Sequence, residues 1–284
     1  MQQSVQRVAV EGAELEVVVQ GSGEPVVLIH GSVLADEFVP MAAEPELRDY
    51  RLIRYHRLGY GGSAGAPGRA SVKRDAADCR AVLAALDVEK AHVAGKSYGG
   101  PVALQLAVDA PDLVHSLALL EPALLAVPSA AQVAEAIAPI GRTYAAGDAA
   151  AAVDAFMVSV WGPSWRDWVE RRVPGGGTQA EQDAAAIFES DLPALQTWRF
   201  GAEDARRVDM PVLLVVGSAS GPLFDEIRDL VHAWFPQTEE AVLADANHGF
   251  PITHPRELAA ALAAFLRRHP VPQGTPGRSS RGTA

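Results

Sequence analysis

The sequence predicts an α/β fold in which a mostly parallel sheet carries helices on both faces and a helical segment is inserted between two strands. Short apolar runs rich in β-branched residues alternate with helical patterns of ten or more residues, an order typical of repeated βα units. One long stretch in the middle of the chain contains only helical patterns. The length of 284 residues suits one such domain with an insertion.

The first third of the chain supplies an edge hairpin and two buried strands. Residues 6–12 and 14–24 alternate apolar and polar side chains, which predicts an antiparallel hairpin around Glu11 and Gly12. The apolar run PVVLIHGS at 25–32 predicts a strand buried on both faces. A similar run at 50–56 predicts a second strand, and the glycine-rich sequence LGYGGSAG that follows predicts a turn away from the sheet.

Helices and strands then alternate. Residues 71–88 carry apolar side chains at helical spacing, and 91–97 form the next apolar strand. A helix is predicted from 98 until Pro111 stops it, followed by a strand at 116–122. After the insertion, strands are expected at 210–217 and 239–245, and a helix at 256–269 closes the fold.

These patterns divide the chain into a core and a cap. Residues 1–122 and 209–270 are interpreted as the two parts of the core, and residues 123–208 as an inserted helical cap broken by Pro-Gly turns. The tail at 271–284 is rich in proline, glycine and serine and has too little apolar surface to bury, so it is predicted to be disordered.

Composition excludes several classes of function. The formal net charge of −11 at pH 7 repels polyanions, so nucleic acid is not expected as a partner. A hydrophobic share of 49% and a mean hydropathy of +0.07 indicate a globular protein rather than a disordered or membrane-bound one. The single cysteine, Cys79, allows no internal disulfide, and no zinc-type Cys/His spacing occurs. With no signal-peptide pattern at the N-terminus, we expect a cytoplasmic protein that acts on a small molecule.

A G-x-S-x-G motif carries the chemistry. Gly95, Ser97 and Gly99 stand where an apolar strand meets a helix rich in alanine and leucine. A tight turn there would hold the serine hydroxyl above the sheet, and glycines are needed where the turn crowds the neighbouring backbone. The N-terminus of the following helix favours developing negative charge.

With this motif in place, the chain resembles the α/β-hydrolase superfamily over nearly its whole length. The matching segments are HGS at 30–32, YHRLGYGGS at 55–63, GKSYGG at 95–100, the helical insertion, and ADANHGF at 244–250. The resemblance implies that Ser97 is the nucleophile and that His248 is the base that takes its proton. It also places the oxyanion donors at the backbone N–H groups of Tyr98 and of the HGSV turn, where we choose Ser32, with Gly31 and Val33 as neighbouring alternatives.

The residue that serves as the acid of the triad is harder to identify. In most of the family it follows the late strand by a few residues, but residues 217–222 read GSASGP, and Ser220 stands at the expected place. Glu121 ends the earlier strand, where a minority of the superfamily, including zearalenone lactonases and some haloalkane dehalogenases, carries its acid. Both strand ends open onto the same edge of a parallel sheet. We therefore expect Glu121 to be the acid; Asp225 in the first turn of a helix, or no acid at all, remains the alternative.

The cap offers aromatic residues for substrate binding. Trp198 is expected to lie nearest the substrate, by analogy with cap aromatics of related hydrolases, and Trp161 is a second candidate. Trp161 and Trp165 are four positions apart and would share one face of a helix. Lys96, within the motif, is expected to point away from the nucleophile.

Together the motif and the resemblance predict a serine hydrolase that uses no cofactor or metal and cleaves a carboxylic ester or lactone through an acyl-enzyme. The expected substrate is uncharged and hydrophobic and sits in an enclosed, mostly apolar pocket. Alternatives are a C–C bond hydrolase, a cofactor-free perhydrolase or haloperoxidase with the same triad, or a ligand-binding receptor that retains the fold.

Overall fold

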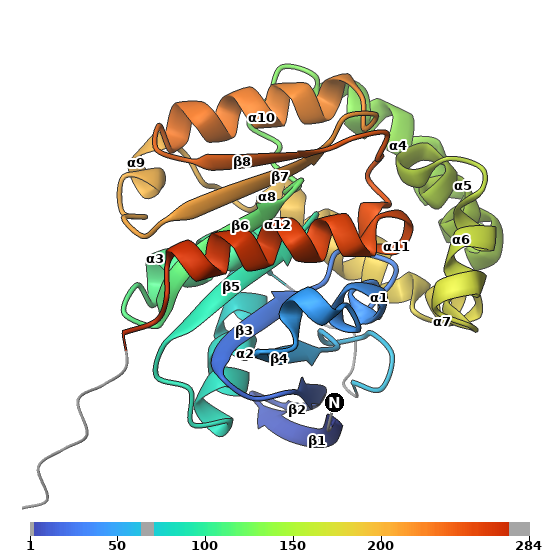
Figure 1. Ribbon diagram of the computed structural model, residues 1–284. Coiled ribbons are helices and arrows are strands. Elements are labelled where there is room, and N and C mark those ends of the chain that lie inside the picture. Colours follow the sequence, from blue (N-terminus) through green and yellow to red (C-terminus); the bar gives the residue numbers. More distant parts are fainter. Residues whose placement is uncertain (1–2, 64–70, 273–284) are drawn as a thin grey trace, which may run out of the picture.

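An eight-stranded sheet forms the centre of the computed structural model of the protein, which describes residues 3–63 and 71–272 (Figure 1). The strands are ordered β1-β2-β4-β3-β5-β6-β7-β8. Strand β2 pairs antiparallel with β1 and β4, and all other pairs are parallel. The strand bounds are β1 Gln3–Val10, β2 Ala13–Gln20, β3 Glu24–Ile29, β4 Tyr50–Tyr55, β5 Ala91–Lys96, β6 Val114–Leu120, β7 Val212–Gly217 and β8 Glu239–Leu243.

The predicted N-terminal hairpin is confirmed as an edge element. Strands β1 and β2 pair in register from Gln3 with Gln20 to Val10 with Ala13. Gly12, at φ +71°, makes the tight turn between them. The apolar runs predicted as strands in the rest of the chain form the parallel part of the sheet, so the α/β fold class is confirmed.

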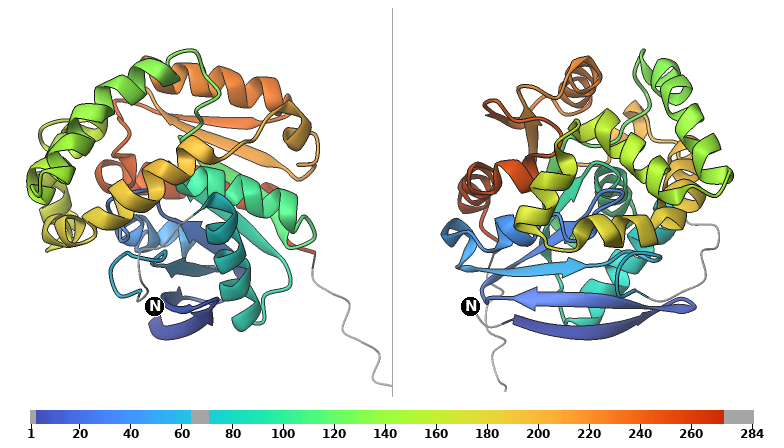
Figure 2. Two further views of the ribbon diagram at one scale, coloured as in Figure 1. Left: turned by 180° about the vertical axis from the view of Figure 1, so that it is seen from behind. Right: turned by 90° about the vertical axis from the view of Figure 1, so that its right-hand side faces the viewer.

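Helices cover both faces of the sheet, as the two views of Figure 2 make clear. On one face lie α2 (Val72–Ala85), α3 (Gly99–Asp109) and α10 (Pro222–Trp234). The other face packs against α1 (Val39–Ala42) and α12 (Pro255–Arg268), with the short α11 (Phe250–Thr253) and the turn η1 (Pro45–Leu47) beside them.

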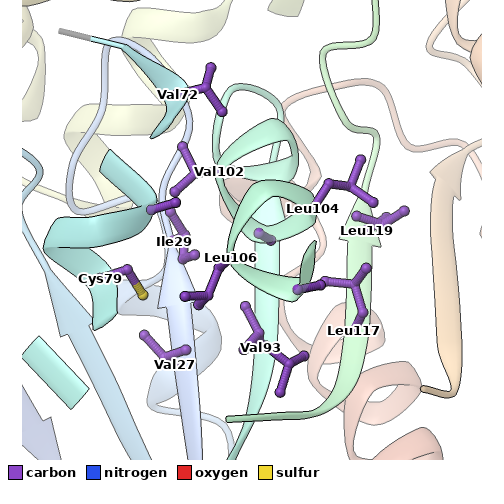
Figure 3. Packing of buried hydrophobic residues seen from close by; sticks show 14 of the residues in the cluster. Val27, Ile29, Val72, Cys79, Val93, Val102, Leu104, Leu106, Leu117 and Leu119 are labelled. Atoms are coloured by element: carbon purple, nitrogen blue, oxygen red, sulfur yellow. The ribbon is translucent and has the colours of Figure 1, made fainter. Parts of the chain in front are cut away.

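Alternating strand side chains build a core on each face. Val27 and Ile29 of β3 point to the cluster that α2 and α3 complete, and Val26 and Leu28 point to the opposite cluster. Figure 3 shows the first cluster, in which Cys79 packs as a small apolar side chain. Because most of the apolar surface of these strands is removed from water, the sheet is a rigid base for the loops at its edge.

Helices alone fill the segment between β6 and β7, and no strand occurs within residues 123–208. Figure 1 shows α4 to α7 gathered at one side of the molecule. The bounds are α4 Ala130–Ala145, α5 Ala149–Trp161, α6 Trp165–Arg172, α7 Gly176–Gln182, the π-helical turn η2 Ala186–Asp191, α8 Leu192–Thr197 and α9 Ala202–Ala205.

One expectation about the cap is wrong. Trp161 and Trp165 do not share a helix face, because Gly162 at φ +92° ends α5 and Trp165 begins α6. A residue with a side chain rarely adopts this φ, which explains why glycine ends the helix here.

Two sequence predictions fall on parts of the chain outside the described residues. The glycine-rich turn is described only as far as Ser63, and of the tail predicted to be disordered only residues 271–272 are described. Within the described ranges, no helix combines the length and the apolar character needed to cross a bilayer.

Candidate active site

Ser97 occupies a strained turn between β5 and α3. Its φ of +51° is rare for a residue with a side chain. The Ser97 N–H donates to the carbonyl of Leu120 at 3.1 Å, and the Ser97 carbonyl accepts from Gly100 N–H at 2.9 Å. A methyl group on Gly95 or Gly99 would overlap neighbouring backbone carbonyls, so the turn needs both glycines. The hydroxyl is thereby held at the carboxyl edge of the sheet, as the motif predicts.

Glu121 occupies a second strained turn, directly after β6. Its φ is +43°, and its side chain is fully buried. The Gly217 N–H at the end of β7 donates to Oε1 at 2.7 Å. Oε2 lies 2.6 Å from His248 Nδ1. Asp225, the alternative acid, is exposed in the first turn of α10, so of the two carboxylates it is Glu121 that contacts the histidine.

His248 lies buried in the loop between β8 and α11. Its ring stacks on Phe224 with centroids 4.3 Å apart. Burial, followed by the nearby charge of Lys96, lowers its pKa to about 4, although the bond to Glu121 acts in the opposite direction. The imidazole is therefore neutral at pH 7, with Nδ1 bonded to the carboxylate and Nε2 able to accept a proton.

The turn after β3 uses one of its backbone donors to fix its own shape. Gly31 N–H donates to Glu37 Oε1 at 2.6 Å, so it is already occupied. Among the hydrogen bonds of residues 3–63 and 71–272, none uses the N–H of Ser32 or of Tyr98. These are the two N–H groups expected from the sequence to act as oxyanion donors.

Lys96 differs from its expected position. Its side chain is buried at the cavity wall rather than directed away from the site. Nζ lies 3.2 Å from Glu37 Oε2 and 5.0 Å from the ring centroid of Trp161. The reason is that the buried Glu37, which also holds Gly31, attracts the ammonium group.

A cavity of about 540 Å³ connects these groups to the cap. Ser32, Ser97, Tyr98 and His248 line one part of it. The described hydrogen bonds include none between Ser97 and His248, although both side chains face this cavity. Apolar side chains dominate the remaining wall, among them Leu124, Val133, Ile137, Phe156, Met157, Val160, Trp161, Phe188, Leu192, Leu223, Phe224 and Ile227.

The structure places the two candidate tryptophans differently. Trp161 lines the cavity, as expected. Trp198 does not: its indole N–H donates to Gln105 Oε1 at 2.9 Å and its ring stacks on Phe200. The expectation for Trp198 is therefore wrong, because a hydrogen-bond acceptor on α3 draws the indole toward the sheet.

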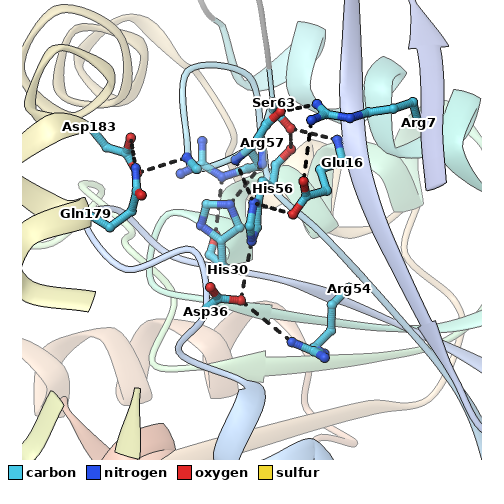
Figure 4. A network of polar contacts seen from close by, with 12 residues as sticks. Arg7, Glu16, His30, Asp36, Arg54, His56, Arg57, Ser63, Gln179 and Asp183 are labelled. Carbon is cyan, nitrogen blue, oxygen red and sulfur yellow. Dashed lines mark hydrogen bonds and ion pairs between the residues drawn. The ribbon is translucent and has the colours of Figure 1, made fainter. Parts of the chain in front are cut away.

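Two histidines near the site have structural contacts (Figure 4). His30 Nε2 accepts from Arg57 N–H at 3.0 Å and braces the loop, as expected from its place after β3. His56 Nδ1 accepts from Gly62 N–H at 3.1 Å, and its Nε2 lies 3.3 Å from Asp36. Both histidines therefore fix the loops beside the site.

Comparison with known proteins assigns the family. The model of the alpha/beta hydrolase fold matches residues 24–255. The chain belongs to the α/β-hydrolase family. The α/β-hydrolase fold predicted from the sequence is therefore confirmed, and the protein is an enzyme of this fold.

Several relatives of this α/β-hydrolase are hydrolases by name. A putative carbamate hydrolase of Pseudomonas syringae is 27% identical over 78% of this chain and 86% of its own length. The enol-lactonase of Burkholderia xenovorans LB400 has a similar fold, with a TM-score of 0.74, 20% identity, and 92% of this chain and 100% of its own covered. A thermophilic esterase of Thermogutta terrifontis gives a TM-score of 0.76 at 23% identity, with coverage of 94% and 100%.

Sequence reasoning missed several residues around the site of this α/β-hydrolase. Phe224, which stacks on His248, lies in an ordinary amphipathic helix, and nothing local marks it. Arg57 and Asp191 form a buried ion pair at 2.7 Å across 134 positions. Within the described residues, no three His, Cys, Asp or Glu side chains converge in a way that could hold a metal ion.

Proposed function

We propose that the protein is a serine hydrolase that cleaves a carboxylic ester or lactone through an acyl-enzyme, with Ser97 as nucleophile, His248 as general base and Glu121 as acid. The observation that carries the proposal is the 2.6 Å contact of Glu121 with Nδ1 of His248, a residue that lines the same cavity as Ser97. A serine hydroxyl is a weak nucleophile without such a base.

Each residue has a defined part in the proposed reaction. Ser97 Oγ attacks the carbonyl carbon while His248 Nε2 takes its proton. The N–H groups of Tyr98 and Ser32 stabilise the oxyanion, and the protonated His248 returns its proton to the leaving alcohol. Water then attacks the acyl-enzyme with the same base. Glu121, fixed by Gly217 N–H, keeps the imidazole in the correct tautomer and stabilises the imidazolium.

The cavity supports an uncharged, apolar substrate. Its wall consists mainly of aliphatic and aromatic side chains, so an apolar acyl or alcohol group gains free energy by leaving water there. The nearest cation, Lys96, is already paired with Glu37 and is not free to bind a substrate carboxylate. Neutral aromatic or branched esters and lactones fit this description best.

Replacing Ser97 by alanine tests the proposal. We expect loss of p-nitrophenyl ester turnover by a thousandfold or more, because a triad acts as a unit, with an unchanged circular dichroism spectrum. Labelling by a fluorophosphonate should occur in the unaltered protein and not in Ser97→Ala. Retention of more than a tenth of the activity in that variant would remove Ser97 from the mechanism.

A panel of substrates separates ester or lactone hydrolysis from the alternative activities. Steady-state turnover of neutral esters and lactones is compared with cleavage of a vinylogous diketone, a C–C substrate, and with peroxide-dependent halogenation. Faster C–C cleavage or halogenation would replace the proposed activity by one of those reactions. Single-turnover labelling without catalysis on any substrate would favour a ligand-binding receptor.

A further inference from the structure

A buried carboxylate of the cap reaches the turn that carries Ser32. Asp191, 1% exposed, is the last residue of η2. Its Oδ2 accepts a hydrogen bond from the Ser32 hydroxyl at 2.6 Å across 159 positions of sequence. Tyr60 OH donates to the same oxygen at 2.7 Å, and Arg57 donates to both oxygens at 2.7 and 2.9 Å. One cap side chain thus receives four hydrogen bonds from the core.

Arg57 extends this contact into the backbone of the turn. Its Nη2 donates to Gly31 carbonyl at 3.1 Å and its Nε to His30 carbonyl at 3.3 Å, the two carbonyls that precede Ser32. Burial opposes the charge of the guanidinium, but Asp191, with Tyr60 and Asp75, raises the pKa of Arg57 well above its usual value. The turn is therefore held by a cation that itself depends on the cap carboxylate.

Tyr98, whose N–H is the other proposed oxyanion donor, also contacts Arg57. The Tyr98 hydroxyl donates to Asp75 at 2.7 Å, and Asp75 lies 3.6 Å from Arg57. The Arg57 guanidinium carbon lies 4.3 Å from the centroid of the Tyr98 ring. Both proposed donors thus come from residues tied to one buried charge cluster.

An oxyanion hole works only if its donors stand about 2.7–3.1 Å from the developing charge before the reaction begins. The Ser32 turn has a strained neighbour, Val33 at φ +83°, and such a conformation persists only when surrounding contacts enforce it. We propose that Asp191 is a positioning residue that holds the Ser32 N–H toward the oxyanion, through Ser32 Oγ and through Arg57, so that the docked cap completes the oxyanion hole. This inference rests on the proposed hydrolase function.

Ser32→Ala tests the link by removing only the hydroxyl, since the backbone N–H remains. With a neutral p-nitrophenyl ester we expect kcat to fall about tenfold and KM to change less than threefold, because the loss falls on the transition state. The inhibition constant of an aryl trifluoromethyl ketone, whose adduct with Ser97 carries the oxyanion, should weaken in parallel. Ser32→Thr, which keeps a hydroxyl, should recover most of kcat.

Ser116→Ala is the matched control. Ser116 is also a buried serine, with its hydroxyl 2.7 Å from His92 Nδ1, and it lies on β6 outside the cavity lining. It should lower the unfolding temperature without changing kcat or ketone affinity. If Ser32→Ala matches Ser116→Ala in both readouts, the link is refuted.

A double-mutant cycle then addresses the cap carboxylate. Asp191→Asn should lower kcat with the same small effect on KM, and its effect should be smaller when Ser32 is already alanine, because the two changes share the contact between Asp191 and Ser32 Oγ. Full additivity would place the effect of Asp191 elsewhere and overturn the proposal. If Asp191→Asn does not fold, the Ser32 variants still decide. Turnover retained in Ser97→Ala would instead defeat the hydrolase proposal itself.

Discussion

Single side chains carry the proposed chemistry at the sheet edge, and Glu121 is the clearest example. Its carboxylate is fixed from two sides, by Gly217 N–H at 2.7 Å and by His248 at 2.6 Å. Ser220, at the usual position of the acid in this family, cannot supply a charge. A triad requires a buried carboxylate that orients the imidazole and stabilises its protonated form.

Glu121→Ala should reduce kcat by up to about ten-thousandfold, because the imidazole loses the group that orients it and stabilises its charged form. Asp225→Ala should leave kcat within twofold, since Asp225 is exposed on α10. Ester turnover of both variants measures the difference. If Asp225→Ala lowers kcat more than Glu121→Ala does, the acid is Asp225, which follows β7, and not Glu121.

The acid limb of the pH profile should reflect the lowered pKa of His248. In the proposed mechanism His248 acts in its neutral form, so kcat/KM should stay constant as pH falls and decline only near the His248 pKa of about 4. Lys96→Met removes a like charge and should move this limb to higher pH. Kinetics between pH 3.5 and 8, with the exposed Lys73→Met as control, provide the measurement. An unchanged limb in Lys96→Met would show that burial alone lowers the pKa.

At the scale of elements, two strained strand ends and the cap helices form the site. Ser97 and Glu121 both have positive φ and follow neighbouring parallel strands, so their side chains emerge at the same edge. The cap helix α4 presents Val133, Ile137 and Gly141 to the cavity at helical spacing. The cap therefore sets the space available to the substrate.

Ile137→Trp should narrow the cavity and discriminate by substrate size. We expect KM for a naphthyl ester to rise about tenfold or more while turnover of p-nitrophenyl acetate stays within twofold, because only the larger group reaches α4. Ala136→Trp, on the exposed side of the same helix, is the control. Equal effects on both esters in Ile137→Trp would mean that the substrate binds away from α4.

At the scale of the whole molecule, an acidic surface surrounds an apolar cavity. The net charge of −11 creates a field that disfavours the approach of anions. Glu189, exposed at the cavity wall and bonded to Tyr144 OH at 2.5 Å, adds a local negative charge. Neutral substrates are repelled neither by the net charge of the protein nor by Glu189.

At low salt, kcat/KM for an ester that carries a free carboxylate should therefore be at least about tenfold lower than for the same ester with a neutral carboxamide in place of the carboxylate. Added salt should narrow the gap, because it screens charges separated by more than about 8–10 Å. The two substrates are compared at 10 mM and 500 mM NaCl. Faster turnover of the anionic ester would contradict the apolar, uncharged pocket.

Local patterns in the sequence were sufficient for the sheet, the edge hairpin and the turn around Ser97. Each depends on residues within a few positions: β-branched runs that fill both faces of a sheet, and glycines where backbone segments approach closely. The contact of Glu121 with His248, 127 positions apart, followed from resemblance and from the rule that parallel strand ends share one edge.

Only the tertiary structure decided how the cap meets the core. Trp198 turns toward Gln105 rather than the cavity, Lys96 lies inside, and Asp191 reaches Ser32. Helical periodicity specifies which face of a helix is apolar, but it carries no information on which distant side chain that face will meet. Those contacts depend on the docking of whole helices, where burial requires each polar group to find a partner wherever the fold brings one within reach.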